Sequence, residues 1–153
     1  MTGSTEPTGG TGLGHRAITL QRLDKGVYAA TNERGGTITI GGGGDRPDFT
    51  PVELLLVAMA GCSATDVDFI TSKRAEPDSF QVECTGEKAR DDCGNHMEDL
   101  TVTFAVTFPS DADGDRARDM LPKAVTMSAD RLCTVSRTVQ LATPVTMTVA
   151  EEE

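Results

Sequence analysis

Residues 50–70 read TPVELLLVAMAGCSATDVDFI, and this stretch predicts a long helix on which the rest of the fold is built. Thr50 and Glu53 have the spacing of a capping box, and Pro51 occupies the first helical position, where its missing N–H does no harm. The first three turns are apolar nearly all round, which indicates burial on most sides. We expect the helix to continue to about Arg74 and to form the central spine of the domain.

Segments rich in β-forming residues stand on both sides of this helix. Three short segments before it are separated by turn-forming residues and predict a meander. Two segments after it alternate apolar and polar side chains, and the polar residues 89–98 between them are expected to form a link. The expected strands are residues 15–23, 26–31, 37–40, 79–88 and 99–108.

The last third of the chain is expected to be mostly helical. Residues 111–127 have apolar side chains at helical spacing, although Pro122 could kink or break that helix. Residues 128–132 predict a short helix that resumes at about Val135, and residues 144–149 predict a closing strand. The order of strands, long helix, strands, helices and strand gives an α+β domain.

Composition and charge limit the class of protein. The chain has 153 residues, of which 37% are hydrophobic, so it fits one domain with a lean core. A lean core at this size favours dimerisation, because a dimer buries further surface. The formal net charge of −10 argues against nucleic acid or an anionic membrane as a partner. No uninterrupted apolar run reaches the ~18 residues that a membrane span needs.

The two ends of the chain have little to bury. Residues 1–14 are rich in threonine and glycine and lack the basic and apolar regions of a secretory signal, so we expect a flexible tail and a cytoplasmic protein. Residues 15–150 are expected to form a single domain, and residues 151–153 an acidic tail. In the cytoplasm, a reduced thiol is more common than a structural disulfide.

Two of the cysteines lie at small-residue breaks in apolar runs. Cys62 follows Gly61 in the long helix, and Cys133 lies between Leu132 and Thr134. Either could be a packed core residue, since free cysteine is among the most buried residue types. Two such settings in one chain instead suggest a redox pair. In such a pair one thiolate reduces a peroxide and becomes a sulfenic acid, and the second thiol condenses with it to a disulfide.

The other cysteines and the histidines suggest no further site. Cys84 alternates with apolar strand residues and is expected to pack among them, and Cys93 is expected to be an incidental thiol in an acidic loop. His15 and His96 lack metal-ligand spacing with the cysteines. The glycines at 41–44 lack the lysine of a phosphate-binding loop. We therefore expect no metal and no cofactor.

The residues around Cys62 and Cys133 resemble the two cysteine motifs of the OsmC/Ohr superfamily. The first motif includes AGCSATDV at residues 60–67, and the second is ADRLCTVS at residues 129–136. Both look most similar to the OsmC-like branch of YhfA type, and the resemblance covers roughly residues 15–150. It implies an OsmC-like fold, in which an antiparallel sheet packs with a long buried central helix. It also implies a tightly intertwined homodimer with its two sites at the interface.

The resemblance further implies an activity. The best-studied members reduce organic hydroperoxides, so Cys62 would be the peroxidatic thiol and Cys133 the resolving thiol, with a dithiol as the reductant. In those members a glutamate directly after the helix-opening proline holds an arginine over the reactive sulfur. The residue at that position here is Val52, and Glu53 comes one residue later.

This difference leaves two functions open. Glu53, Arg46 and Ser136 are the candidate supporting residues for a peroxidase site, and Arg22 and Arg34 are further arginines in the expected region. The alternative is an OsmC-fold protein that binds a small apolar molecule without turnover, and it is motivated by Val52.

Overall fold

The computed structural model describes residues 12–152, so most of the predicted tail at residues 1–14, and the last residue of the acidic tail, lie outside the described residues. The chain divides into two compact units, with the boundary between Leu54 and Leu55. The chain contains both helices and antiparallel strands, which confirms the predicted α+β class.

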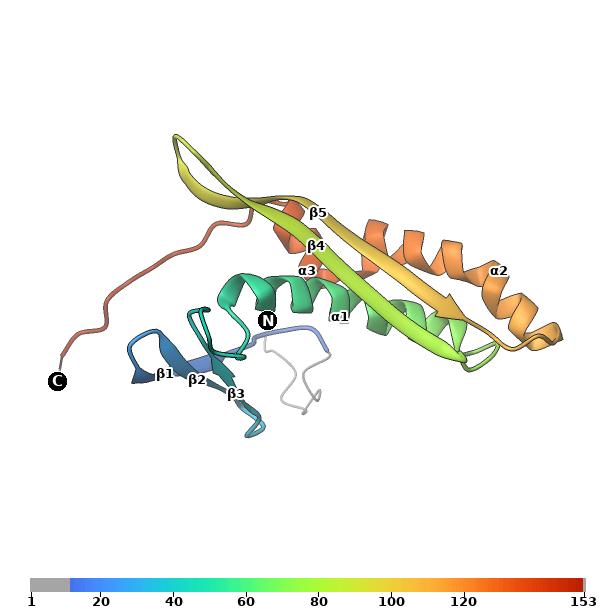
Figure 1. The fold of residues 1–153 in the computed structure, drawn as a ribbon, viewed down its shortest axis with the longest axis horizontal. Helices are drawn as coiled ribbons and strands as arrows, with labels where there is room; N and C mark the ends of the chain where they lie inside the picture. The colour runs from blue at the N-terminus through green and yellow to red at the C-terminus, as the bar shows by residue number, and fades with distance from the viewer. Residues whose placement is uncertain (1–11, 153) are drawn as a thin grey trace. The chain divides into compact units, whose positions relative to one another are not determined.

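The first unit contains a three-stranded antiparallel sheet (Figure 1). Its strands β1 (Ile18–Asp24), β2 (Val27–Asn32) and β3 (Thr37–Ile40) are hydrogen-bonded in sequence order, which confirms the predicted meander. The β1–β2 turn places Gly26 at a φ of 72°, a conformation that glycine adopts without steric cost. The next turn is closed by the Asn32 side chain, whose Oδ1 accepts hydrogen bonds from the backbone N–H groups of Arg34 and Gly36.

The helix α1 (Pro51–Thr71) begins at the predicted capping box. The Glu53 carboxylate accepts a hydrogen bond from the Thr50 N–H at 3.0 Å, and the Thr50 hydroxyl accepts one from the Glu53 N–H at 3.3 Å. The helix ends at Thr71, slightly before the expected Arg74, and the chain turns there with the Arg74 N–H bonded to the Thr71 carbonyl.

Within one chain, α1 is buried on one stripe and not on most sides as predicted. The buried residues recur every four positions, as expected for one face of a helix: Met59, Ser63, Val67 and Thr71. A second stripe, which includes Val57 and Phe69, is exposed, with 67% of Phe69 accessible. The apolar composition of α1 therefore exceeds what this chain alone covers.

By length and composition alone, α1 is also apolar enough to cross a membrane. This corrects the expectation that no stretch would qualify: of the three carboxylates in the helix, Glu53, Asp66 and Asp68, no more than two fall within one qualifying 18-residue window. The same test is passed by core helices of soluble proteins, so one such helix is weak evidence for a membrane span.

The second unit contains a long hairpin of β4 (Ser79–Asp91) and β5 (Gly94–Thr107), which Figure 1 shows as a twisted ribbon. The two strands continue into residues 89–98 and leave only residues 92 and 93 between them, so the predicted polar link is wrong. Cross-strand pairing continues as far as Asp91 and Gly94, and a tight turn at Gly94, with a φ of 130°, replaces the link. One face of the ribbon alternates half-buried apolar side chains, and the rings of Phe80 and Phe104 meet edge to face at 6.5 Å.

Three helical segments follow the hairpin. They are α2 (Ala112–Met127), a π-helical turn η1 (Ser128–Leu132) and α3 (Thr134–Gln140). Pro122 lies inside α2 without ending it, so the possible break at this position does not occur. At the start of α2, the Asp111 side chain accepts a hydrogen bond from the Gly114 N–H at 2.7 Å and caps the helix.

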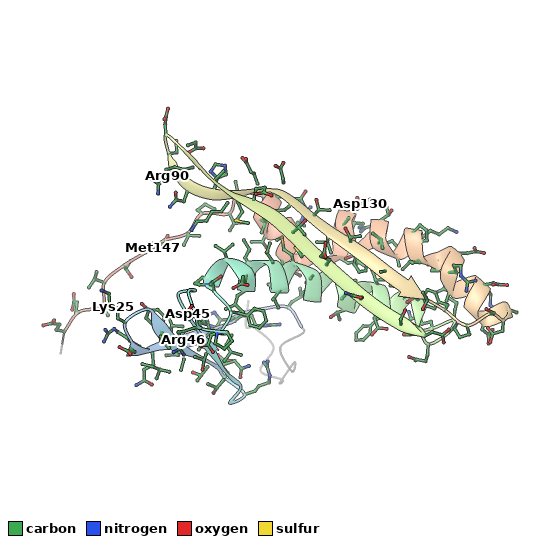
Figure 2. All side chains as sticks on the ribbon, in the orientation of Figure 1. Lys25, Asp45, Arg46, Arg90, Asp130 and Met147 are labelled. Carbon is green, nitrogen blue, oxygen red and sulfur yellow. The ribbon has the colours of Figure 1, made fainter. Side chains whose placement is uncertain are left out.

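The predicted closing strand at residues 144–149 does not form. Residues 143–152 have no regular secondary structure, and their side chains are exposed, with Val145 at 79% and Val149 at 95%. Figure 1 shows this tail extending away from α3, and Figure 2 labels Met147 on it. The alternation typical of a strand is present, but none of the described strands of this chain pairs with it.

Candidate functional site

The two cysteines singled out by the sequence lie together in the second unit. Cys62 lies midway along α1, and Cys133 is the residue between η1 and α3, where the backbone is extended with a φ of −75° and a ψ of 101°. The two thiols are hydrogen-bonded to each other, and both are free thiols. The fold therefore joins residues that are far apart in the sequence.

Cys133 has hydrogen-bonding partners from both sides. The Ser63 hydroxyl donates to Cys133 Sγ at 3.3 Å, and the Ser136 N–H donates to the same sulfur at 3.4 Å. The Ser136 hydroxyl lies 3.2 Å from the sulfur, where it accepts from the thiol and can donate to a thiolate. Ser63 comes from the buried stripe of α1, and Ser136 comes from the first turn of α3.

These contacts favour the ionised form of Cys133. The thiol is only 2% exposed, and this burial opposes ionisation. The hydrogen bonds from Ser136 and Ser63 outweigh the burial, so the pKa of Cys133 is lowered from its ordinary value. Hydrogen bonds to a thiolate are charge-assisted, which makes them stronger than those to a neutral thiol.

Cys62 shows the opposite shift. Burial raises the pKa of Cys62, and the hydrogen bond to Cys133 raises it further, against the opposing backbone hydrogen bonds of Val135 and Thr134. The two opposite pKa shifts favour a singly protonated pair in which Cys62 keeps its proton and Cys133 carries the negative charge. Cys62 is half-buried, so it is the more exposed of the two cysteines.

A cavity of about 340 Å³ borders the serines that contact Cys133. Ser63 and Ser136 both line it, together with apolar side chains from β5 and α2, namely Leu100, Val102, Phe104 and Val125. Neither cysteine is among its lining residues. Ser128, Asp130 and Gln140 line it as well, so the cavity combines an apolar side with hydroxyl, carboxylate and amide groups. A lining of this mixed kind can hold a small organic molecule that also carries polar atoms.

A further pair of polar side chains joins α1 to η1 beside this cavity. The Ser128 hydroxyl donates to the Asp66 carboxylate at 2.9 Å, and Ser128 is 2% exposed. Asp66 lies one turn after Cys62, and Ser128 lines the cavity. This contact fixes the start of η1 against α1, and so it helps to position the segment that carries Cys133.

Sequence reasoning missed Ser63 and Ser128 as parts of the site. A signal for Ser63 was present, because it directly follows Cys62 and shares the four-residue spacing of the buried stripe of α1. Ser128 carried no comparable signal, because its partner Asp66 is 62 residues away in the sequence.

The three supporting residues suggested by the sequence lie in different places. Ser136 contacts the sulfur of Cys133, as described above. Arg46 and Glu53 belong to the first unit, where the Arg46 guanidinium (Figure 2) pairs with Asp48 at 2.7 Å. Glu53 serves as the capping residue of α1, and its hydrogen bonds with the Thr50 backbone and side chain lower the pKa of its carboxyl group.

The remaining thiols and histidine form no second site. Cys84 is half-buried in β4, where burial raises its pKa, and Cys93 is exposed in the hairpin turn. His96 lies near the carboxylates of Glu98 and Asp91, and these contacts raise the pKa of the imidazole. Among residues 12–152, no group of three or more acidic, cysteine or histidine side chains could hold a metal ion.

Comparison with known proteins places this geometry in a family. Residues 42–148 match the family model described as OsmC-like protein. The chain is 32% identical over 107 residues to the protein YhfA of Escherichia coli K12, an alignment that covers 69% of this chain and 75% of that relative.

Solved structures share the fold. An OsmC-like protein from Mycoplasma pneumoniae superposes with a TM-score of 0.65 at 14% identity, over 83% of this chain and 88% of its own. The organic hydroperoxide resistance protein OhrB of Bacillus subtilis superposes with a TM-score of 0.50 at 16% identity, over 84% of this chain and 93% of its own. At these identities the similarity concerns the fold alone.

Proposed function

The chain belongs to the OsmC-like protein family, and on that premise we propose that it is a thiol-dependent reductase of organic hydroperoxides. The observation that carries the proposal is the hydrogen-bonded pair of free thiols, Cys62 and Cys133, in which one sulfur favours the ionised form. Two thiols in contact can form a disulfide with little movement, and this is the product that a two-cysteine peroxidase needs. A protein of similar fold, OhrB, is named for organic hydroperoxide resistance, and this name supports the same chemistry.

In the proposed reaction, Cys62 provides the attacking sulfur because it is the more exposed of the two cysteines. Cys62 passes its proton to the Cys133 thiolate and attacks the distal oxygen of the hydroperoxide. The O–O bond breaks, the alkoxide takes a proton from solvent and leaves as an alcohol, and Cys62 becomes a sulfenic acid. Cys133 then attacks the Cys62 sulfur, which releases water and leaves a disulfide for a dithiol reductant to reduce.

This reaction gives Cys133 two tasks. Its sulfur accepts the proton of Cys62 before it forms the disulfide, and the hydrogen bonds from Ser63 and Ser136 make it the more acidic thiol of the pair. A pair of this kind can generate a Cys62 thiolate without a neighbouring cation. Among the described residues of the second unit, the side-chain hydrogen bonds to Cys133 Sγ come from serines and not from an arginine.

The cavity supports an organic substrate over hydrogen peroxide. The apolar side chains of its mixed lining, which include Leu100 and Phe104, can cover the organic group of a hydroperoxide. Its hydroxyl groups, Ser63 and Ser136, can hydrogen-bond to the peroxide oxygens.

The proposal includes a homodimer. The exposed stripe of α1 carries Val57, Gly61, Thr65 and Phe69 at a spacing of four residues. Nothing lies within 4 Å of a Cβ built on Gly61, so the small residues leave room for another helix to approach closely. The exposed tail at residues 143–152 has the alternation of a strand without a partner in its own chain, which also favours a second copy.

The proposal also covers the location and the other partners of the protein. The net charge of −10 argues against nucleic acid and anionic membrane surfaces as partners, and the apolar face of α1 is proposed to meet its dimer partner and not lipid. The proposed location is the cytoplasm, where thiols are commonly kept reduced.

The direct test is to add cumene hydroperoxide to the reduced protein and to map disulfides by mass spectrometry. We expect rapid formation of a Cys62–Cys133 disulfide and consumption of one equivalent of peroxide per chain. Cys62→Ser should abolish turnover, whereas Cys93→Ser, which removes an exposed thiol in the hairpin turn, should leave it unchanged. Thiols that stay reduced under excess peroxide would refute the enzyme proposal.

The second candidate is a small-molecule-binding protein without turnover. The cavity favours it, because neither cysteine lines the cavity and burial raises the pKa of Cys62. Thermal unfolding separates the two functions. If the protein only binds small molecules, an apolar alcohol such as cumyl alcohol should raise its melting temperature strongly. Its thiols should then stay reduced when peroxide is added.

A further inference from the structure

The two sulfurs of the site differ in ways that matter for breaking a disulfide as much as for making one. Cys133 is 2% exposed, whereas Cys62 is half-buried on α1. A reductant that attacks a Cys62–Cys133 disulfide must reach one sulfur along the line of the S–S bond. Access therefore favours attack on Cys62.

The second difference concerns the sulfur that leaves. In thiol–disulfide exchange, the sulfur with the better-stabilised thiolate departs faster. The Ser63 hydroxyl and the Ser136 N–H donate to Cys133 Sγ at 3.3 and 3.4 Å, and the Ser136 hydroxyl lies at 3.2 Å. In the reduced structure these donors surround Cys133 Sγ, so they are placed to stabilise the thiolate that forms when the bond breaks. Access and leaving-group stability thus favour the same direction of attack.

We propose that recycling runs in one direction, with the reducing dithiol attacking Cys62 and Cys133 departing as a thiolate held by Ser63 and Ser136. This inference rests on the proposed function for its place in a catalytic cycle. Ser63 and Ser136 are positioning residues, because they act on the reductant through the sulfur of Cys133.

The electrons and protons of the step balance. A thiolate of the dithiol forms a bond to Cys62 Sγ, the Cys62–Cys133 bond breaks, and the electron pair of that bond stays on Cys133. The second thiol of the reductant loses its proton and attacks the first sulfur of the reductant, which is bonded to Cys62 in the mixed disulfide. This releases the reductant as a cyclic disulfide and leaves the Cys62 thiolate. The dithiol is oxidised by two electrons, and the protein disulfide is reduced to two thiols.

The direction of attack can be determined with a monothiol reductant, because a monothiol has no second thiol in the same molecule to resolve the mixed disulfide that it forms. The disulfide is first installed with diamide, so the test does not depend on peroxidase activity. The oxidised protein then reacts briefly with N-acetylcysteine, is quenched in acid, and is alkylated and mapped by mass spectrometry. We expect the N-acetylcysteine adduct on Cys62 and the alkyl group on Cys133. An adduct mainly on Cys133, or divided equally between the two, would overturn the inference.

The role of the serines is tested on the same diamide-oxidised protein. Ser63→Ala and Ser136→Ala should each slow reduction by dithiothreitol about five- to tenfold, because each removes a hydroxyl that stabilises the departing thiolate. Ser63→Thr and Ser136→Thr keep the hydroxyl and should restore most of the rate. Ser79→Ala is a matched control, since Ser79 bonds Thr107 at 2.6 Å on the β4–β5 hairpin and contacts neither cysteine.

The two proposals fail separately. A protein that does not react with peroxide, but whose diamide-made disulfide opens at Cys62, refutes the peroxidase and retains the inferred direction of reduction. A protein that consumes peroxide but forms its adduct on Cys133 retains the peroxidase and refutes the direction. Serine-to-alanine variants that are reduced at the wild-type rate would also refute the part assigned to Ser63 and Ser136.

Discussion

At the residue scale, the site depends on which sulfur of the pair holds the proton. Burial acts on both thiols, but only Cys133 has enough hydrogen-bond donors to reverse its effect. Because the two thiols share a hydrogen bond, their titration is that of a pair, and the first proton to leave comes from Cys133. The chemistry of Cys62 therefore cannot be separated from that of Cys133.

This coupling predicts a pH dependence for the first oxidation step. In the wild-type protein the rate of peroxide consumption should rise with pH and then reach a plateau. The midpoint of the rise should lie below the pKa of an ordinary thiol, because the lowered pKa of Cys133 sets it. In Cys133→Ser, Cys62 must ionise by itself, and burial raises its pKa, so the midpoint should move to higher pH. Single-turnover stopped-flow measurements between pH 6 and pH 10 would give both profiles.

The comparison has a clear negative outcome. If Cys133 acts only as the resolving thiol, Cys133→Ser will block disulfide formation but leave the midpoint of the first step unchanged. Cys93→Ser serves as the control, since Cys93 is exposed in the hairpin turn and has no contact with the pair.

At the element scale, the chain shows where local sequence rules are enough and where they are not. The capping box at Thr50 and Glu53 was read correctly, because both partners lie within one helical turn. The polar segment 89–98 was read wrongly as a link, because an exposed hairpin end buries little on either face and loses the apolar alternation. In that segment, cross-strand hydrogen bonds replaced burial as the source of order.

The start of α2 gives a prediction about stability. Gly114 lies so close to the Pro109 carbonyl that a Cβ at this position would collide with backbone atoms, which cannot rotate away. Gly114→Ala should therefore lower the free energy of unfolding by about 3 kcal/mol, through strain at the tight entry to the helix. Urea denaturation followed by circular dichroism would measure the change.

A second glycine provides the matched control for this variant. A Cβ on Gly42 would meet no atom closer than the Gly26 carbonyl oxygen at 3.6 Å, which is an ordinary contact. Gly42→Ala should change the free energy of unfolding by no more than about 0.5 kcal/mol. If the two substitutions lowered the free energy of unfolding equally, the close approach at Gly114 would not be the cause of the loss of stability.

At the scale of the whole molecule, one chain leaves much apolar surface uncovered. Phe69 on α1 and Met147 on the tail are 67% and 90% exposed, and both are large apolar side chains. Exposed apolar side chains that recur along α1 and along the tail are typical of an interface. The single-chain fold therefore accounts for only part of the burial that the composition suggests.

The dimer proposal predicts the mass in solution and its response to two changes. Analytical ultracentrifugation of the wild-type protein should give a species of twice the chain mass of 16.1 kDa. Gly61→Leu should shift the equilibrium to monomer, because it fills the small-residue surface of α1, and deletion of residues 143–153 should weaken the dimer as well. Lys73→Ala is an exposed control just beyond α1 and should have no effect. A wild-type monomer at micromolar concentration would contradict the proposal.

The sequence alone determined the features that arise within a few neighbouring residues or from a repeating pattern. It determined the start of α1, the meander, the five-strand count outside the tail, and the two cysteines as the residues to examine. Each of these depends on local spacing, and local spacing is what a helical turn or a strand pairing through a short turn requires.

Only the tertiary structure decided which thiol is stabilised as an anion. Ser63 and Cys133 are 70 residues apart in the sequence, and their hydrogen bond exists because η1 and α3 return the chain to the buried stripe of α1. The cavity beside them is bounded by β5, all three helices and η1, and no short segment could have indicated it. A thiol pKa depends on donors gathered in space, and those donors are set by packing between distant segments.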